Sequence, residues 1–304
     1  MFHLKKGIMF CLFIGRFARG GVMLEVAYYD GQIGSSKDVK VPFDDRTHFF
    51  GDGVYDATIA ANGVVYLLEE HLDRFYSSAA QLEINVPMGK KELGDLINDL
   101  TGRVDSLTKF VYWQVSRGVA WRNHAYEPDM QGKISIFVRP CADIAKTLPA
   151  PVKAITVPDN RFELCNIKTL NLIPSVVAYQ KAKKAGVFEA IFHRQGIVTE
   201  CAHSNVSILK DGIFYSHPND NFILRGIGKT HLIKACYRES VPVIERAFTL
   251  DELFDADEVI ITSSADMCQA VCEIDGRKVG GKDAETMRKI GMSSLKEYFD
   301  ITGL

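Results

Sequence analysis

The sequence predicts an α+β protein of two domains. Many short apolar segments joined by Asp-Gly and Asn-Gly turns indicate strands, and a few longer segments have the spacing of amphipathic helices. Strands and helices do not alternate as in a doubly wound fold, and no internal repeat is found. The length of 304 residues exceeds the ~100–200 residues of a usual single domain, so two domains are expected.

In the first half, two turns mark hairpins, Asp30-Gly31 and Asn62-Gly63. Apolar residues recur at helical spacing from Leu68 to Leu82, and the same pattern follows Lys90. In order, we expect strands at 25–29, 32–33, 54–61 and 64–67, helices at 68–82 and 90–101, and strands near 109–116 and 134–138.

In the second half, a helix is expected to begin at Pro174, because proline suits the first turn, and Gly186 marks its C-terminal end. In order, we expect a strand at 153–157, a helix at 174–184, strands at 189–193, 198–200, 206–210 and 213–216, a helix at 229–239, strands at 243–246, 258–262 and 270–274, and a helix at about 283–299.

The domain boundaries follow from these elements. Residues 141–152 contain Pro149 and Pro151 among small and polar residues, so we expect an interdomain linker there. A smaller N-terminal α/β domain would span 23–140, and a larger β-rich domain would span 153–304. Residues 1–22 form an extension that resembles a signal peptide without its small-residue cleavage site; we expect the folded protein to start near Met23.

Composition excludes several classes of function. The net charge is −2 and no long basic block occurs, so nucleic acid is not an expected partner. No apolar run approaches the ~20 residues that span a bilayer, so no membrane partner is expected. The seven cysteines are scattered, without a disulfide framework or zinc spacing; this predicts no metal site and favours a reducing cytoplasm.

Two ionisable residues stand in unusual settings. Lys168 lies in Cys165-Asn166-Ile167-Lys168-Thr169-Leu170, and Glu200 follows Ile197-Val198-Thr199. Burying an ammonium group is costly unless it is paired or neutralised, and a Schiff base to a carbonyl cofactor such as pyridoxal 5'-phosphate (PLP) would neutralise it. A carboxylate would then keep the pyridine nitrogen of that cofactor protonated. A lysine that reaches the surface from a strand end and an exposed glutamate are the alternatives.

The chain from about Met23 to its end resembles the fold-type IV PLP enzymes, and among them most closely the D-amino-acid aminotransferases. The matching blocks occur in family order over nearly the whole chain. They are Phe50-Gly51-Asp52-Gly53-Val54-Tyr55, Glu70-His71-Leu72-Asp73-Arg74, Arg122-Asn123-His124, Ile167-Lys168-Thr169-Leu170-Asn171, Val198-Thr199-Glu200, Ser204-Asn205-Val206, Gly226-Ile227 and Thr262-Ser263-Ser264.

The resemblance implies that PLP is the cofactor and that Lys168 is the catalytic lysine, which forms the Schiff base and moves the proton. It implies that Glu200 pairs with the ring nitrogen and that Arg74 binds the phosphate, although Glu70 and Arg74 would otherwise read as an exposed helical ion pair. The remaining residues that it places at the cofactor are Ile227, Gly228, Ser263, Ser264 and Arg161.

The resemblance also implies a substrate. Arg122, His124 and Tyr55 match the family's trap for the substrate α-carboxylate, an arrangement that branched-chain aminotransferases lack. In the family this loop reaches the neighbouring subunit's site, so a homodimer is expected. We therefore expect transamination of D-amino acids, with D-alanine as donor and 2-oxoglutarate or another 2-oxo acid as acceptor.

Alternatives remain on the same fold. They are a branched-chain L-amino-acid aminotransferase, an aminodeoxychorismate lyase and a non-catalytic PLP-binding protein. The chain departs from its relatives at Gly228, where threonine is common, at Ala202-His203, where serines are common, and at Asp56, where glutamate is common. These departures bear on phosphate contacts and on the surroundings of Glu200.

Overall fold

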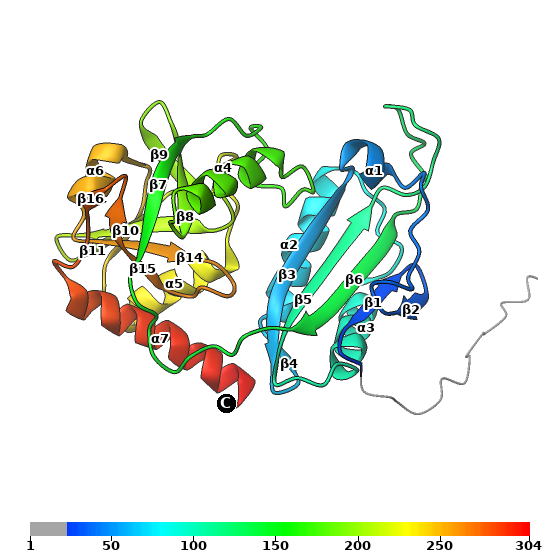
Figure 1. The fold of residues 1–304 in the computed structure, drawn as a ribbon, viewed down its shortest axis with the longest axis horizontal. Coiled ribbons are helices and arrows are strands. Elements are labelled where there is room, and N and C mark those ends of the chain that lie inside the picture. Colours follow the sequence, from blue (N-terminus) through cyan, green and yellow to red (C-terminus); the bar gives the residue numbers. More distant parts are fainter. Residues whose placement is uncertain (1–22) are drawn as a thin grey trace, which may run out of the picture.

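The computed structural model describes residues 23–304, so the predicted extension over residues 1–22 lies outside the described part. Two domains lie side by side, and residues 141–151, which contain no helix or strand, connect them along one edge (Figure 1). The mixture of helices and strands is the α+β architecture that the sequence predicts.

The first domain is an antiparallel six-stranded sheet in the order β2-β1-β6-β5-β3-β4. Helices α2 and α3 cover one face of it, because α2 buries Leu72 and Phe75 against Trp113 of the sheet (Figure 1). The elements are β1 (Val26–Tyr29), β2 (Gln32–Gly34), α1 (Arg46–Phe50), β3 (Gly53–Ala61), β4 (Val64–Val65), α2 (Leu68–Gln81), α3 (Lys90–Gly102), β5 (Thr108–Ser116) and β6 (Lys133–Pro140).

The second domain is built on a mixed sheet of ten strands, which runs β12-β11-β10-β14-β15-β7-β8-β9-β13 with β16 attached to β15. Its elements are β7 (Val152–Pro158), α4 (Ile173–Lys184), β8 (Glu189–Arg194), β9 (Ile197–Cys201), β10 (Asn205–Lys210), β11 (Ile213–Ser216), α5 (Ile227–Arg238), β12 (Val243–Glu245), β13 (Phe248–Thr249), α6 (Leu250–Asp255), β14 (Glu258–Thr262), β15 (Gln269–Ile274), β16 (Arg277–Lys278) and α7 (Ala284–Thr302).

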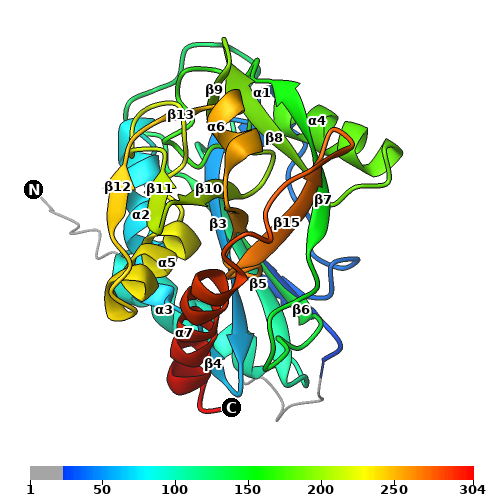
Figure 2. The same ribbon diagram turned by 90° about the vertical axis from the view of Figure 1, so that its left-hand side faces the viewer.

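A separate apolar cluster joins the two domains. Tyr66, which follows β4, packs edge-on against Tyr298 of α7 with ring centroids 5.2 Å apart. Beside it, the Glu70 carboxylate of α2 lies 2.9 Å from Nε2 of His231 in α5. Figure 2 shows α7 reaching from the second domain towards β4. These contacts hold the two domains together beside α7.

Short elements account for most differences from the expected pattern. Helix α1, strand β16 and the pair β13–α6 were not expected, because each has too few residues for a periodic signal. Helix α6 nevertheless carries a recognisable start: Thr249 accepts from the Glu252 amide at 3.1 Å, and the Glu252 carboxylate accepts from the Thr249 amide at 2.8 Å. That capping box is readable as Thr-x-x-Glu.

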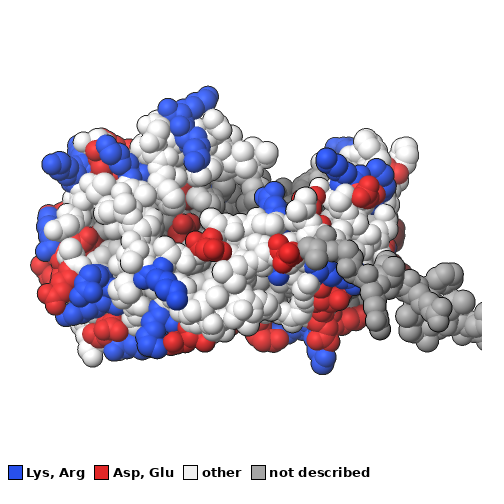
Figure 3. Space-filling model, turned by 60° about the horizontal axis from the view of Figure 1, so that its bottom comes forward, with Lys and Arg blue, Asp and Glu red and all other residues white. Residues whose placement is uncertain are grey.

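The charged side chains are mixed in sign over the face that Figure 3 shows, as the net charge of −2 predicts. None of the helices within residues 23–304 combines the length and the hydropathy that crossing a membrane would require.

Candidate active site

A cavity of about 780 Å³ opens between the two domains. Its volume is within the ~300–1,000 Å³ that ligand pockets usually have. All the residues predicted to hold cofactor or substrate line it except Arg122; they are Tyr55, Arg74, His124, Arg161, Lys168, Glu200, Ile227, Gly228, Ser263 and Ser264. Residues from far apart in the sequence therefore meet at one place.

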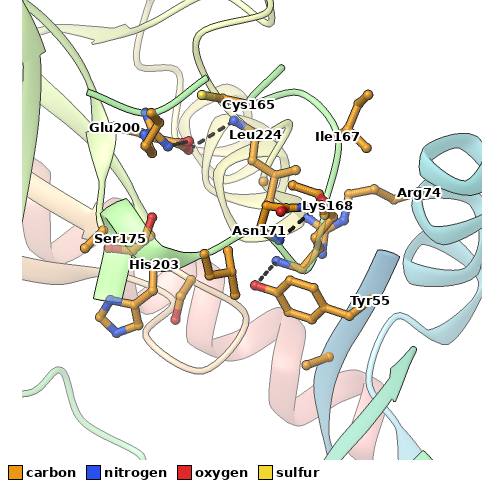
Figure 4. Close-up of a pocket in the computed structure, with 18 of the residues that line it drawn as sticks. Tyr55, Arg74, Cys165, Ile167, Lys168, Asn171, Ser175, Glu200, His203 and Leu224 are labelled. Atoms are coloured by element: carbon orange, nitrogen blue, oxygen red, sulfur yellow. Dashed lines mark hydrogen bonds and ion pairs between the residues drawn. The ribbon is translucent and has the colours of Figure 1, made fainter. Parts of the chain in front are cut away.

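Lys168 belongs by sequence to the second part of the chain but is attached to the first sheet. The Tyr55 amide of β3 donates to the Lys168 carbonyl at 2.9 Å, and Ser78 of α2 accepts from the Lys168 amide at 3.1 Å. Ile167 is buried in the core of the first domain. The Lys168 Nζ lies 3.4 Å from the Tyr55 hydroxyl, inside the cavity (Figure 4). The lysine backbone is thus rigid while its amine faces open space.

Glu200 stands on β9, at the other end of the cavity in Figure 4, and its side chain is buried. One carboxylate oxygen pairs with Arg161. The other accepts from the Asn205 side chain at 2.9 Å and from the Leu224 amide at 3.1 Å. Burial raises the pKa of Glu200 above its ordinary value, and Arg161 opposes that rise. The carboxylate is held in one orientation from two sides.

Arg161 is itself held by Asp159. Its guanidinium donates to both Asp159 oxygens, at 2.9 and 2.8 Å, and Thr199 and Arg194 add further bonds to that carboxylate. Burial opposes the charge of Arg161, but the bond to Asp159 and the charge of Glu200 raise its pKa above the usual range. A short chain from Asp159 through Arg161 therefore fixes Glu200.

Arg74 forms a second buried network near the opposite end of the cavity. Its guanidinium donates to both oxygens of Asp56 at 2.9 and 2.7 Å, and to the Arg225 carbonyl at 3.2 Å. His71 lies 2.7 Å from the same carboxylate. Burial opposes the charge of Asp56, but Arg74 and His71 hold its pKa well below the usual range. The network leaves Arg74 oriented at the cavity wall.

The first turn of α5 supplies amide donors beside Arg74. Gly226 caps this helix without a side-chain bond, and no acidic residue occupies the first turn. A Cβ added at Gly226 would lie 1.8 Å from the Asn205 side-chain oxygen, and one at Gly228 would lie 2.6 Å from the Ser263 carbonyl oxygen. The two glycines therefore let Asn205 and the Ser263 turn approach the helix end closely. Such a helix N-terminus binds anions.

These donors fit a phosphorylated pyridine cofactor. The Thr262 hydroxyl, which lines the cavity beside the helix end, is buried and has no hydrogen-bond partner among the described residues. Buried hydroxyl groups are seldom left unpaired, so an acceptor is expected there. Arg74, the α5 amides and the Thr262 hydroxyl would hold the phosphate of such a cofactor. Glu200 would pair with its protonated ring nitrogen, and Lys168 would bind its carbonyl carbon.

The predicted carboxylate trap is only partly assembled within one chain. Tyr55 and His124 line the cavity, and the Tyr55 ring stacks on Tyr112 with centroids 5.5 Å apart. Arg122 is exposed, with its guanidinium 5.1 Å from the centre of the Phe50 ring, and does not line the cavity of its own chain.

Sequence reasoning missed the carboxylates behind the two arginines. The sequence marks Asp56 only as a departure from glutamate, and nothing in it indicates a role for Asp159. The signal for Asp56 was its place next to Tyr55 in a strand, where an isolated carboxylate requires a partner once buried. Asp159 precedes Arg161 by two residues in Asp-Asn-Arg, a spacing that gives no such signal.

A fold of this kind with a lysine between a buried carboxylate and an anion cradle defines an aminotransferase of class IV. The family model described as "Amino-transferase class IV" matches residues 53–274. The chain belongs to this family.

Among its relatives, the D-alanine aminotransferase of Listeria monocytogenes serotype 1/2a is 38% identical over 266 residues, 86% of this chain and 91% of that protein. The D-alanine aminotransferase of Bacillus licheniformis is 36% identical over 252 residues, 83% of this chain and 89% of that protein. The predicted resemblance is thereby confirmed.

Solved structures share the fold at lower identity. A branched-chain amino acid aminotransferase from Escherichia coli has a TM-score of 0.82 at 20% identity and covers 92% of this chain and 95% of its own. A branched-chain aminotransferase of Thermoproteus uzoniensis has a TM-score of 0.79 at 23% identity. The match covers 90% of this chain and 97% of that one. The predicted fold class is therefore confirmed.

Proposed function

We propose that this protein is a PLP-dependent transaminase of D-amino acids, with D-alanine as donor and 2-oxoglutarate or another 2-oxo acid as acceptor. The observation that carries the proposal is the placement of Lys168 between Glu200 and the anion donors around Arg74. Identity of 36–38% to D-alanine aminotransferases supports the D-amino-acid substrate over the branched-chain alternative, which is shared only at the level of fold. No feature of the described residues favours a lyase or a non-catalytic protein.

When bound, PLP supplies an electron-withdrawing ring that stabilises negative charge at the substrate Cα. Lys168 would hold its carbonyl and afterwards carry the Cα proton as general base and acid, a role worth ~10²–10⁴-fold in rate. The Tyr55 hydroxyl at 3.4 Å orients the lysine amine. Arg161, Asn205 and the Leu224 amide hold the Glu200 carboxylate, which would pair with the ring nitrogen and keep it protonated.

The same proposal includes a homodimer in the cytoplasm. Arg122 lies outside the cavity of its own chain, which is what a residue serving the neighbouring site requires. Apolar side chains of α4 near the cavity are exposed, with Ile173 at 74% and Val176 at 58%, and a second copy would cover them. The six cysteines of the described residues are unpaired, which supports a reducing compartment.

Initial rates with D-alanine and with L-leucine, each paired with 2-oxoglutarate, test the substrate. We expect turnover of D-alanine with little turnover of L-leucine. Turnover of L-leucine without D-alanine would contradict the proposal and favour the branched-chain activity.

A further inference from the structure

One histidine on the cavity wall has no part in the chemistry described above. His203 follows Glu200 by three residues, on the turn after β9, where serines are common in relatives. Its side chain is 50% exposed and lines the cavity, and its Nδ1 pairs with the carboxylate of Glu189. Within residues 23–304, Nε2 of His203 has no hydrogen-bond partner. One donor position of the ring is therefore available to a ligand.

Glu189 is fixed behind the histidine rather than in the cavity. Its side chain is fully buried in β8. The Ser204 hydroxyl donates to one of its oxygens and the Ala190 amide to the other, each at 2.8 Å. The Tyr179 ring of α4 lies 4.8 Å from the His203 ring and limits its rotation. The imidazole is thus held in place.

The surroundings favour the charged form of His203. Burial lowers its pKa, but the bond and the charge of Glu189, with a smaller contribution from Asp266, raise it above the ordinary value, while Lys168 opposes them. Asp266 itself accepts from the Ser263 hydroxyl at 3.0 Å. An imidazolium carries a proton on both nitrogens, so in this form Nε2 is a charged donor.

The position of His203 separates it from the predicted trap. In Figure 4 it lies across the cavity from Tyr55 and from the Lys168 amine. The arginines that line the cavity are each neutralised by a carboxylate of the same chain; the pairs are Arg46 and Arg117 with Asp52, Arg74 with Asp56, and Arg161 with Asp159 and Glu200. His203 is paired through Nδ1 with Glu189, and within residues 23–304 its Nε2 has no partner.

We propose that His203, held by Glu189, binds the distal carboxylate of dicarboxylic substrates, D-glutamate and 2-oxoglutarate, and so raises their turnover relative to that of substrates with a single carboxylate. The inference rests on the proposed transaminase function. A substrate with one carboxylate at the Tyr55 side and a second carboxylate across the cavity makes both contacts, whereas D-alanine makes only the first.

The test compares His203→Gln with the unaltered holoenzyme. The ratio of kcat/KM for D-glutamate to that for D-alanine should fall roughly 10- to 100-fold, because a hydrogen bond to a charged group is lost. Lys183→Gln is the matched control. The Lys183 amine lies 5.2 Å from the centre of the same Tyr179 ring, but Lys183 does not line the cavity. This variant therefore changes the charge near His203 without removing the proposed contact to the substrate carboxylate. A ratio that stays within about twofold in His203→Gln, or falls equally in both variants, overturns the proposal.

A binding measurement separates this inference from the proposed function. Calorimetric affinity for glutarate, relative to butyrate, should weaken by a similar factor in His203→Gln, and in the unaltered protein it should weaken as pH rises and His203 loses its proton. Equal affinity of glutarate for both proteins overturns the inference even if D-alanine is transaminated. Absence of all D-amino-acid turnover with a His203-dependent glutarate site instead overturns only the proposed function.

Discussion

The Tyr55 amide donates to the Lys168 carbonyl at 2.9 Å, and the Tyr55 hydroxyl lies 3.4 Å from the Lys168 Nζ. Tyr55 of β3 therefore contacts both the backbone and the side-chain amine of Lys168. The Lys168 amine is positioned by the first domain, although Lys168 follows residues 141–151 in the sequence. Glu200 and α5, in contrast, belong to the second domain.

Replacing Lys168 by alanine should abolish transamination, because the general base and the covalent attachment of the cofactor are lost together. We expect kcat to fall by at least ~10³-fold, and the visible absorbance of the lysine-bound cofactor to disappear. The control is Lys184→Ala, an exposed lysine at the end of α4. Retention of that absorbance in Lys168→Ala would refute the assignment of the lysine.

Glu200→Gln keeps the shape of the side chain but removes its charge. Arg161 then loses one of its two carboxylate partners, and a ring nitrogen would lose the anion that keeps it protonated. We expect kcat to fall ~100-fold or more with the cofactor still bound. Rates should be unaffected by Glu163→Gln, whose carboxylate is 72% exposed and pairs with Arg194 at 3.8 Å. An equal loss in both variants would contradict a specific role for Glu200.

Asp56→Asn should destabilise the fold by about 3–5 kcal/mol at pH 7, because Arg74 would be left as a buried charge without its partner. The pKa of Asp56 is lower in the folded than in the unfolded chain. Its stabilisation is therefore complete above the unfolded value of ~3.9 and is lost as pH falls through the folded value. Urea unfolding of the unaltered protein and of Asp56→Asn, measured from pH 7 to pH 3, gives the contribution of Asp56 at each pH.

The difference in the free energy of unfolding between the unaltered protein and Asp56→Asn should become smaller as the pH falls towards 3. The control is Asp73→Asn, whose carboxylate is 68% exposed beside Lys90 and should contribute less than ~1 kcal/mol. A larger loss in Asp73→Asn than in Asp56→Asn would show that the buried network does not stabilise the fold.

Gly228→Thr restores the residue common in relatives but should harm this protein. The added Cβ would lie 2.6 Å from the Ser263 carbonyl oxygen, so the turn beside the α5 N-terminus must shift. We expect a loss of about 1–3 kcal/mol in stability and weaker retention of PLP. Gly89→Ala is the control, since no atom lies within 4 Å of a Cβ at that helix cap. Tighter PLP binding by Gly228→Thr would contradict the expected clash.

The proposed sharing of the carboxylate trap between two subunits can be tested with hybrid dimers. Arg122→Ala and Lys168→Ala should each be inactive alone if Arg122 serves the neighbouring site. Mixing the two after mild dissociation should restore activity, because one site of the hybrid pairs an intact Lys168 with an intact Arg122 from the other chain. Activity that never exceeds the sum of the separate variants would contradict a trap shared across a dimer.

The sequence predicts the long elements and the chemical residues for different reasons. Helix α2 is predictable because Leu72 and Phe75 recur at helical spacing, whereas α1 and β16 are too short to have a period. Lys168, Glu200 and Arg74 are found through motif resemblance. Asp159 and Glu189 are not found in this way: Asp159 lies two residues from Arg161, a spacing without a recognisable signal, and Glu189 meets His203 only after β8 and β9 pair.

The attachment of Lys168 to β3 has a mechanical consequence. A molecule bound at once to Lys168, Glu200 and the α5 amides would tie the two sheets together across the open side of the junction, opposite the apolar contact at Tyr298. Loading the site should then slow amide hydrogen exchange in β3 and in the first turn of α5 together, since ligands that bind only the native state suppress opening. The cofactor would then add to the contacts that already join the two domains at Tyr298 and between Arg74 and the Arg225 carbonyl.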